Sequence, residues 1–275
     1  MDEISLLTTL DQNYLPQLQV LLTSLSINNP GERFRLYLLH SGIPDQDLAG
    51  VRQQCELYGY PFLPVVVTDT LFRSAPVTRQ YPKEMYYRLL APQLLPAEVQ
   101  RIIYLDPDTL VINPIRPLWE TDLSGNLFAA AAHTGKAELV SGINQLRLGT
   151  ERDYYNSGVL LMDLDVGRQV IRAQELFDYV DLHRKELLLP DQDVLNALYS
   201  KRILSLKDVL WNYDARNYSS YLLRSGGVCD MRWVMEHTSI LHFCGKDKPW
   251  KAKYFYRFGT LYRHYMQVTK RLCTM

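Results

Sequence analysis

The sequence lacks the features that mark several common classes of protein. No apolar run approaches the roughly 18 residues of a membrane-spanning helix. The start, Met1-Asp2-Glu3-Ile4, lacks the basic region and the long apolar region of a secretory signal peptide. Lys and Arg number 30, and Asp and Glu also number 30, so the charge balance gives no reason to expect nucleic-acid binding. There are no repeats or low-complexity segments. These absences favour an ordinary globular chain with a sizeable core.

Cysteine is scarce and widely spaced. The four cysteines are Cys55, Cys229, Cys244 and Cys273, and no two of them form a C-x-x-C pair. This spacing argues against a zinc ribbon and against a disulfide framework. It is typical of a protein kept in a reducing compartment, so we expect the chain to be cytoplasmic.

Two common nucleotide-binding motifs are also missing. No G-x-G-x-x-G follows the first predicted strand, which makes a dinucleotide-dependent dehydrogenase a weak interpretation. No G-x-x-x-x-G-K-[ST] occurs, which excludes the P-loop kinases and ATPases.

The sequence does contain alternating strands and helices. Its 275 residues are 47% hydrophobic and 22% charged, which suits one large α/β domain or two small ones. Alternation of strand and helix predicts βαβ units and a parallel sheet. The predicted strands are 4–9, 34–39, 62–67, 101–105, 127–132 and 203–206. The predicted helices are one that starts at Leu15 and stops near 28–31, then 44–58, 83–95, one helix over 167–186, and one that starts at Pro190. We predict a loop with some helix for 134–152, and 211–229 has no assignment.

Ligands bind such sheets at the carboxyl ends of the strands. The first strand ends at Thr8 and Thr9, and Asp11 and Asn13 follow it. We therefore expect these side chains at the rim of a pocket. Asp11 and Asn13 are equally compatible with a plain turn.

Two aspartates follow the fourth predicted strand, in the segment I-I-Y-L-D-P-D-T-L-V that begins at Ile102. Side chains two apart on an extended backbone share a face, and Pro107 holds Asp106 extended. Asp106 and Asp108 therefore form a pair suited to a hard divalent cation. The alternative is a plain strand-to-turn junction, because Asp and Pro are ordinary turn residues.

Several other polar residues have two interpretations. Arg88 lies among apolar helical positions and either packs its stem or binds a phosphate or carboxylate. Asn156-Ser157-Gly158, directly before a buried strand, is either a turn or a sugar-facing segment. Asp191-Gln192-Asp193 follows Pro190 at a helix start, where an acid is commonly a cap or first-turn residue, but three hydrogen-bonding side chains in a row exceed what capping requires.

The stretch from Ile240 to Trp250 contains His242 after an apolar pair, then a glycine, two lysines and Pro-Trp. A lone histidine after an apolar run is usually structural. The lysines that follow could neutralise phosphates. Two carboxylates, an imidazole and a diphosphate form a reasonable ligand set for a divalent metal.

The segment from Trp250 to Met275 has six basic residues and no acidic one, with aromatic residues interleaved. It is either a surface helix whose aromatics pack on the domain or an amphipathic segment that lies on an anionic membrane. We favour the membrane interpretation here.

Four stretches, in this order, resemble one family. They are Leu10 to Tyr14, the D-x-D of Tyr104 to Val111, Asn156 to Met162 with Asp191-Gln192-Asp193 after it, and the H-x-C-G-x-x-K-P-W that begins at His242. The chain resembles the family 8 glycosyltransferases, the retaining group that includes bacterial lipopolysaccharide galactosyltransferases and glycogenin. The resemblance spans nearly the whole chain, from Ile4 to Trp250.

The resemblance implies a GT-A fold, an α/β architecture whose Rossmann-like, mixed and mainly parallel central sheet is flanked by helices. We expect one such domain over 1–250 and a basic-aromatic tail over 251–275, with peripheral contact to the inner face of a membrane. The implied activity moves galactose or glucose from a UDP-hexose to a saccharide or glycolipid acceptor in lipopolysaccharide or cell-surface polysaccharide synthesis. The implied metal is Mn²⁺, with Mg²⁺ as an alternative.

The resemblance also implies roles for residues at matching positions. Asp106, Asp108 and His242 would ligand the metal. Thr9, Asp11, Asn13 and Tyr14 would surround the uridine; Arg88, Asn156, Asp191 and Gln192 would hold the donor sugar; and Gly245 and Lys248 would hold the diphosphate. Gln192 is nearest to the expected nucleophile, but an amide is a poor nucleophile, so same-face attack by the acceptor is favoured. Asp191 as the nucleophile stays open.

Two other functions stay open from sequence alone. A nucleotidyltransferase that makes NDP-sugars would share the sheet and the metal, but a glycine-rich basic loop is expected after its first strand, and Leu10 to Tyr14 has neither glycine nor lysine. The other is a non-catalytic nucleotide-sugar-binding protein.

Overall fold

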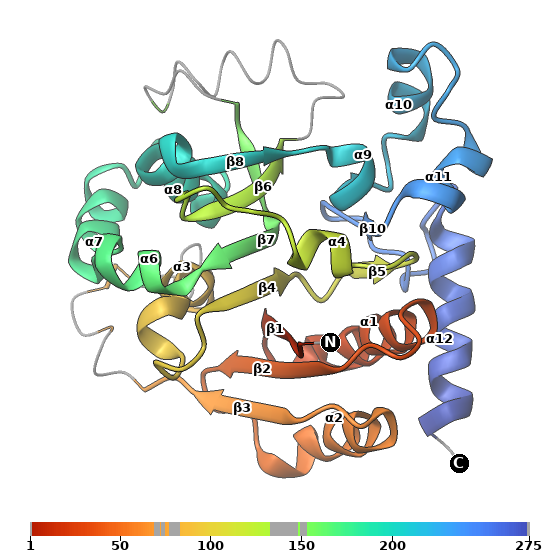
Figure 1. Cartoon of the computed structure of the whole chain (residues 1–275), viewed down its shortest axis with the longest axis horizontal. Helices are drawn as coiled ribbons and strands as arrows, with labels where there is room; N and C mark the ends of the chain where they lie inside the picture. Colours follow the sequence, from red (N-terminus) through yellow and green to blue (C-terminus); the bar gives the residue numbers. More distant parts are fainter. Residues whose placement is uncertain are drawn as a thin grey trace.

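A computed structural model describes residues 2–68, 72, 75–76, 83–132, 148 and 153–273 of the chain. Two sheets organise these residues (Figure 1). The larger has seven strands in the order β3-β2-β1-β4-β7-β6-β8, and the smaller has three in the order β5-β10-β9. The loop prediction for 134–152 lies almost entirely outside the described residues.

The first half of the large sheet follows the predicted βαβ pattern. Strands β1, β2, β3 and β4 pair in parallel, and α2 ends where predicted, at Gly59, which has a φ of 70°. The elements of this half are β1 (Ile4–Thr9), a 3-10 turn (Gln12–Tyr14), α1 (Leu15–Asn28), β2 (Phe34–His40), α2 (Asp45–Tyr58), β3 (Phe62–Val66), α3 (Glu84–Leu94) and β4 (Arg101–Leu105).

The second half of the large sheet is mixed. Strand β7 (Tyr155–Asp163) runs antiparallel to both of its neighbours, β4 and β6 (Phe128–Ala132), whereas β6 and β8 (Ile203–Leu206) are parallel. Among the described strands of this sheet, all except β7 share one direction. The expected mixed, mainly parallel sheet is confirmed.

The turn interpretation of Asn156-Ser157-Gly158 is wrong. These residues belong to β7, which begins at Tyr155, opposite Ala132 of β6. Gly158 also accepts a backbone hydrogen bond of 2.8 Å from Asp106 just beyond β4. Pairing on both sides overrides the local turn preference of Asn, Ser and Gly.

The single helix predicted over 167–186 is also wrong, because two helices occupy this region. Helix α6 (Leu164–Val170) starts early, at a cap formed by Asp163, and α7 (Ala173–Leu182) follows. Ile171 between them is extended and has no exposed surface, because its side chain fills the core under the sheet. Burial of this residue requires the break.

The small sheet lies beside the end of β4 (Figure 1). Its strands are β5 (Thr109–Val111), β9 (Tyr213–Asp214) and β10 (Ile240–His242), with β10 between the other two. The region 211–229, which had no assignment, contains β9 and α10. The remaining elements are α4 (Arg116–Trp119), α8 (Pro190–Tyr199), a 3-10 turn (Ser200–Arg202), α9 (Asp208–Trp211), α10 (Tyr218–Arg224), α11 (Met231–His237) and α12 (Gly259–Cys273).

Both faces of the large sheet are buried. Along β7, Leu160 and Met162 join one core cluster, with α3, α6, α7 and α8, and Val159 and Leu161 join another, with α1 and α2. A strand buried on both faces reads as a continuous apolar run, as V-L-L-M does here. The pocket-forming ends of these strands are therefore held by packing on two sides.

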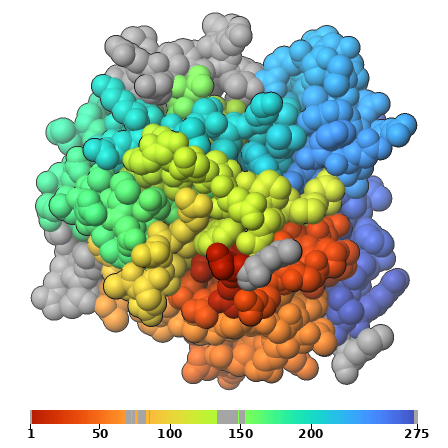
Figure 2. Space-filling view, viewed as in Figure 1, coloured from red at the N-terminus to blue at the C-terminus, as the bar shows by residue number. Residues whose placement is uncertain are grey.

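Most aromatic side chains of the C-terminal segment pack on the protein. Tyr254, Phe258, Tyr262 and Tyr265 lie in a third core cluster with residues of the small sheet. Helix α12 packs along α1, where Tyr265 and Thr269 bond to Asn28 and Thr23 (Figure 2). Among the aromatics of this segment, Phe255 is 90% exposed and Tyr256 is 40% exposed. Within the described residues no helix is both long and apolar enough to cross a membrane.

Candidate active site

The two aspartates lie where the chain crosses from one sheet to the other. Asp106 follows β4 of the large sheet, Pro107 and Asp108 form a turn, and β5 of the small sheet begins at Thr109. Thr109 closes the turn by donating its hydroxyl to the Asp106 carbonyl at 2.8 Å. The strand and turn interpretations are therefore both partly right. Asp106 directly follows a strand, and Asp108 lies in the turn that leads to the next one.

Strand pairing brings a distant histidine to this turn. His242 pairs with Thr109 across the small sheet, and Phe243 donates its N–H to the Asp108 carbonyl at 3.0 Å. His242 Nε2 lies 3.7 Å from Asp106 Oδ2 and 3.4 Å from Asp108 Oδ1. Among the described residues, these three side chains offer one ligand atom each within 4.8 Å of one another. The cluster predicted from sequence is thus brought together.

The cluster has the chemistry of a divalent-cation site. Two carboxylates and an imidazole are ligands that Mn²⁺ accepts, and Mg²⁺ prefers the oxygens alone. Lys248 Nζ is bonded to Asp108 and to the Phe243 carbonyl, so a cation already neutralises one edge of the cluster. Burial raises the pKa of the Asp108 carboxyl, but His242 and Lys248 outweigh burial and hold the pKa well below its usual range. Asp108 is therefore ionised at neutral pH.

Gly158 makes room for this cluster. A Cβ atom added at Gly158 would lie 2.3 Å from His242 Cε1 and 2.6 Å from Asp106 Oδ2, closer than real contacts allow. Its φ does not require glycine, so the close approach of the two side chains is the reason for glycine here. The donor set of two carboxylates and an imidazole fits a divalent metal ion, and Asp106, Asp108 and His242 would hold it.

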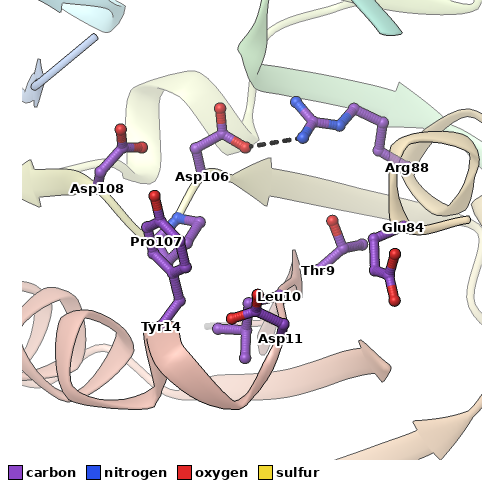
Figure 3. Close-up of a pocket in the computed structure, with 9 residues that line it drawn as sticks. All are labelled: Thr9, Leu10, Asp11, Tyr14, Glu84, Arg88, Asp106, Pro107 and Asp108. Atoms are coloured by element: carbon purple, nitrogen blue, oxygen red, sulfur yellow. Dashed lines mark ion pairs between the residues drawn. The ribbon is translucent and has the colours of Figure 1, made fainter. Parts of the chain in front are cut away.

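Arg88 links the cluster of proposed metal ligands to helix α8. Its guanidinium pairs with Asp106 at 3.2 Å (Figure 3). It also pairs with Asp191 at 3.0 Å and lies 4.7 Å from the centre of the Tyr104 ring. Burial lowers the pKa of Arg88, but Asp106, Tyr104 and Asp191 outweigh it and raise the pKa above its ordinary value. The arginine is therefore a permanent positive charge at the back of the pocket, rather than a packed stem with its head in water.

Asp191 and Gln192 belong to one hydrogen-bonded group with β7. Ser157 donates its hydroxyl to Asp191 at 2.9 Å, and Asn156 donates its amide to Gln192 Oε1 at 3.0 Å. The third member of the D-Q-D run differs. Asp193 is buried and accepts the N–H groups of Leu188 and Leu189, so it stabilises the entry to α8.

The rim of the pocket comes from the end of β1 and the turn after it. The cavity measures about 370 Å³ and is lined by Thr9, Leu10, Asp11, Tyr14, Glu84, Arg88, Asp106, Pro107 and Asp108 (Figure 3). Thr9 and Asp106 are connected through Tyr104, whose hydroxyl bonds to both at 3.2 and 2.6 Å. Asn13 does not line the cavity; its backbone and side chain both donate to Asp11, as the turn interpretation predicted.

Two expected diphosphate residues follow β10. Gly245 has a φ of +83°, a left-handed conformation that favours glycine, and a Cβ there would have to displace the end of the Arg216 side chain. Lys248 lies beside Asp108, and its Nζ is 5.8 Å from the centre of the Trp250 ring. Neither residue lines the described cavity, but Lys248 contacts it through Asp108.

Sequence reasoning gave no role to Tyr104 or Asn212, and it named Ser157 only as part of the segment Asn156-Ser157-Gly158. Tyr104 looked like an ordinary strand residue, and Asn212 fell in the unassigned region 211–229. Asn212 bonds to His242 Nδ1 at 2.9 Å, through a contact between residues 30 positions apart. No local pattern signals such a contact. Ser157 had a usable signal, since it lies between Asn156 and Gly158.

Comparisons with known proteins identify the family. Residues 5–253 match the family model described as glycosyl transferase family 8. A general stress protein A of Bacillus subtilis is 30% identical over 278 residues, which cover 98% of this chain and 95% of that protein. A lipopolysaccharide 1,2-glucosyltransferase of Escherichia coli K12 is 27% identical, over 87% of this chain and 70% of that protein.

A solved structure of the galactosyltransferase LgtC with donor and acceptor sugar analogs superimposes with a TM-score of 0.79, at 22% identity, and covers 96% of both chains. The fold is therefore the GT-A fold of sugar-transferring enzymes. The chain belongs to glycosyl transferase family 8. Its substrates are accordingly a sugar donor and an acceptor, and its family is typically metal-dependent.

Proposed function

We propose that this protein transfers a hexose, galactose or glucose, from UDP to a saccharide or glycolipid acceptor, with retention of anomeric configuration and with Mn²⁺ or Mg²⁺. The observation that carries the proposal is the Asp106, Asp108 and His242 cluster at the end of a cavity lined by Thr9, Asp11 and Tyr14. A nucleotide against β1 would direct its diphosphate toward these carboxylates. A bound cation would offset the charge that builds on the departing diphosphate.

The chain's own residues have distinct roles in this proposal. Tyr14 and Asp11 face the nucleoside, and Lys248, with Gly245, lies toward the diphosphate. Arg88 holds the Asp191 and Asp106 carboxylates in place and turns its positive charge to the donor sugar. Preorganised positive charge near a leaving oxyanion is the usual source of rate enhancement in such transfers.

Retention can be achieved by same-face attack. The bond between the anomeric carbon and the UDP oxygen breaks, the acceptor oxygen bonds to the same face, and the acceptor's proton passes to the leaving phosphate. Three contacts support this route over a covalent intermediate. Gln192 Oε1 is engaged by Asn156, and the Asp191 carboxylate is paired with Arg88 and Ser157. An ion-paired carboxylate is a weakened nucleophile.

A panel of UDP-sugars tests the donor without knowledge of the acceptor. With Mn²⁺, we expect slow hydrolysis of UDP-galactose or UDP-glucose above background, lost with EDTA and absent with GDP-mannose as control. Proton NMR of the released hexose, read before it mutarotates, should show the α-anomer. UDP-sugar binding by calorimetry without UDP release, with every acceptor tried, would favour a non-catalytic binder. Pyrophosphate release from UTP and a hexose 1-phosphate would instead favour a nucleotidyltransferase.

The structure leaves fewer aromatic side chains of the C-terminal segment exposed for a membrane contact than the sequence analysis expected. Four aromatics of the C-terminal segment are buried in the protein, which leaves Phe255 and Tyr256 exposed among Lys251, Lys253 and Arg257. We propose that 251–257 contacts anionic lipid. Removal of the segment would also expose the core, so the test is Phe255→Ser with Lys253→Glu. This variant should lose sedimentation with anionic liposomes, and wild type should not sediment with neutral ones. Equal sedimentation of the variant and wild type would reject the contact.

A further inference from the structure

A chain of three amides connects the candidate metal ligand His242 to Gln192. Asn212 lies between α9 and β9, has no exposed surface, and its Oδ1 lies 2.9 Å from His242 Nδ1. Its Nδ2 donates to Asn156 Oδ1 at 2.9 Å. Asn156 in turn donates its Nδ2 to Gln192 Oε1 at 3.0 Å. The two sheets are thus linked behind the site by side-chain amides.

One backbone N–H fixes the direction of every bond in this chain. The two ends of an amide have nearly the same shape, so its orientation follows from its partners. Gly158 donates its backbone N–H to Asn156 at 2.9 Å, and a backbone N–H can only donate. The Asn156 atom at this point must therefore be the oxygen. Its NH₂ group then faces Gln192, and Gln192 must accept with Oε1.

The position of the proton on His242 follows from the same hydrogen bonds. Asn212 meets the Asn156 oxygen, so it must present Nδ2 there and Oδ1 to His242. An oxygen that faces a ring nitrogen requires that nitrogen to be protonated. His242 therefore carries its proton on Nδ1, and a neutral ring has its lone pair on Nε2. Nε2 is the atom that faces Asp106 and Asp108.

We propose that Asn212 is a positioning residue for this site. It holds His242 in the Nδ1–H tautomer that can ligand a metal, and it ties the orientation of that ligand to Gln192. The proposal rests on the proposed use of a metal by Asp106, Asp108 and His242. Partners that fix the second nitrogen of a ligating histidine commonly change metal affinity by about 10- to 100-fold when they are removed.

Two substitutions separate positioning from a general structural role. Asn212→Leu keeps the approximate size and removes both hydrogen bonds. Asn212→Asp keeps an oxygen for His242 Nδ1 but sets a second oxygen against Asn156. Mn²⁺ affinity, measured from the electron paramagnetic resonance signal of free Mn²⁺, should weaken about 10- to 100-fold in Asn212→Leu. It should stay near the wild-type value in Asn212→Asp, which should show a raised KM for the sugar donor.

Asn29→Leu is the matched control, because Asn29 is a buried, hydrogen-bonded asparagine away from the cavity. It should leave Mn²⁺ affinity unchanged, even if it lowers stability. Unchanged Mn²⁺ affinity in folded Asn212→Leu, or equal losses in the Leu and Asp variants, would overturn the proposal. Wild-type protein that fails to bind Mn²⁺ would overturn the metal itself, so the two failures are distinguishable.

A measurement on the wild type covers the case in which Asn212→Leu does not fold. ¹¹³Cd²⁺ is a diamagnetic stand-in for Mn²⁺, and its coupling to ¹⁵N identifies the ligating ring atom directly. We expect coupling to His242 Nε2 and a proton on Nδ1, assigned by loss of the signal in His242→Ala. Coupling to Nδ1, or a proton on Nε2 of the metal-bound ring, would overturn the proposal.

Discussion

The two sheets contribute to the candidate site in different ways. The seven-stranded sheet supplies Asp106 from the end of β4 and is packed on both faces, with the nearby Arg88 on α3. The three-stranded sheet supplies His242, followed by Lys248, and pairs β5 with β10, which lies more than 100 residues later in the sequence. The first sheet is a scaffold, and the second adds functional side chains from a distant part of the sequence. The site exists only at their junction.

The junction itself is short. Asp106, Pro107 and Asp108 are the only residues between β4 and the Thr109 that starts β5, and Gly158 and the Asn156–Asn212 pair bridge the two sheets behind them. We therefore predict that changes at the junction reduce activity more than they reduce stability. Changes within either sheet, away from the junction, should do the reverse.

The largest effect is expected from removal of a junction carboxylate. Asp106→Ala or Asp108→Ala removes one of the two proposed carboxylate ligands, and turnover of the UDP-sugar with Mn²⁺ should fall at least about 1000-fold, or about 4 kcal/mol of transition-state stabilisation. Turnover and Mn²⁺ affinity are the measurements. Glu56→Ala, an exposed acid on α2, is the control and should behave as wild type. Full activity in both aspartate variants would refute the metal assignment.

The next effect tests the space at the junction. In Gly158→Ala the new methyl group would displace His242 and Asp106 together, and a misplacement of about 1 Å can cost about 100-fold in rate. We expect a loss of that size in kcat and a destabilisation of about 1–3 kcal/mol by thermal unfolding.

Gly50→Ala is the matched control, since its Cβ would meet only the flexible end of Gln19, at 3.3 Å, and glycine is a poor residue inside α2. It should be neutral or stabilising. Wild-type kcat in Gly158→Ala would show that the two ligands tolerate movement.

A smaller effect is expected from the lysine that follows the small sheet. Lys248→Ala removes a positive charge from beside the proposed leaving group, so kcat should fall about 10- to 100-fold, and the KM for the donor should change much less. Lys201→Ala, an exposed lysine before β8, is the control. A change confined to KM would contradict a role in departure and would assign Lys248 to ground-state binding.

The same contrast explains what the sequence could and could not reveal. The βαβ half was predicted to within a residue or two, because hydrophobic periodicity is a local property of the sequence. Pro30 and Gly59 also mark where the first two helices end. The helix break at Ile171 was missed, because tertiary burial of one side chain decides it. Within the site, Asp106 and His242 were found as motif residues, and the family resemblance paired them. Their common partner Asn212 was missed, because nothing near it in sequence marks a contact with residue 242.

The smallest effect is expected from an ion pair in the scaffold, away from the junction. Glu32 and Arg116 form a mostly buried pair, with 14% and 15% of their side chains exposed. The hydrogen bonds from Arg116, opposed by burial, lower the pKa of Glu32 in the folded protein. Because the folded pKa is depressed, the stabilisation is complete above the unfolded glutamate pKa of about 4.3 and disappears as the pH falls through the lower folded value.

Glu32→Gln should therefore lower the free energy of unfolding by about 1 kcal/mol at pH 7 and leave kcat unchanged, and its difference from wild type should shrink as the pH falls below the unfolded glutamate pKa of about 4.3. Urea unfolding at pH 7, 5 and 3 measures this, and Arg116→Gln with the double variant isolates the pair energy. A difference that persists at low pH would mean that Glu32 acts through packing rather than charge. A loss of kcat would show that the scaffold and the junction are coupled. Stability and activity could then not be assigned to separate parts of the molecule.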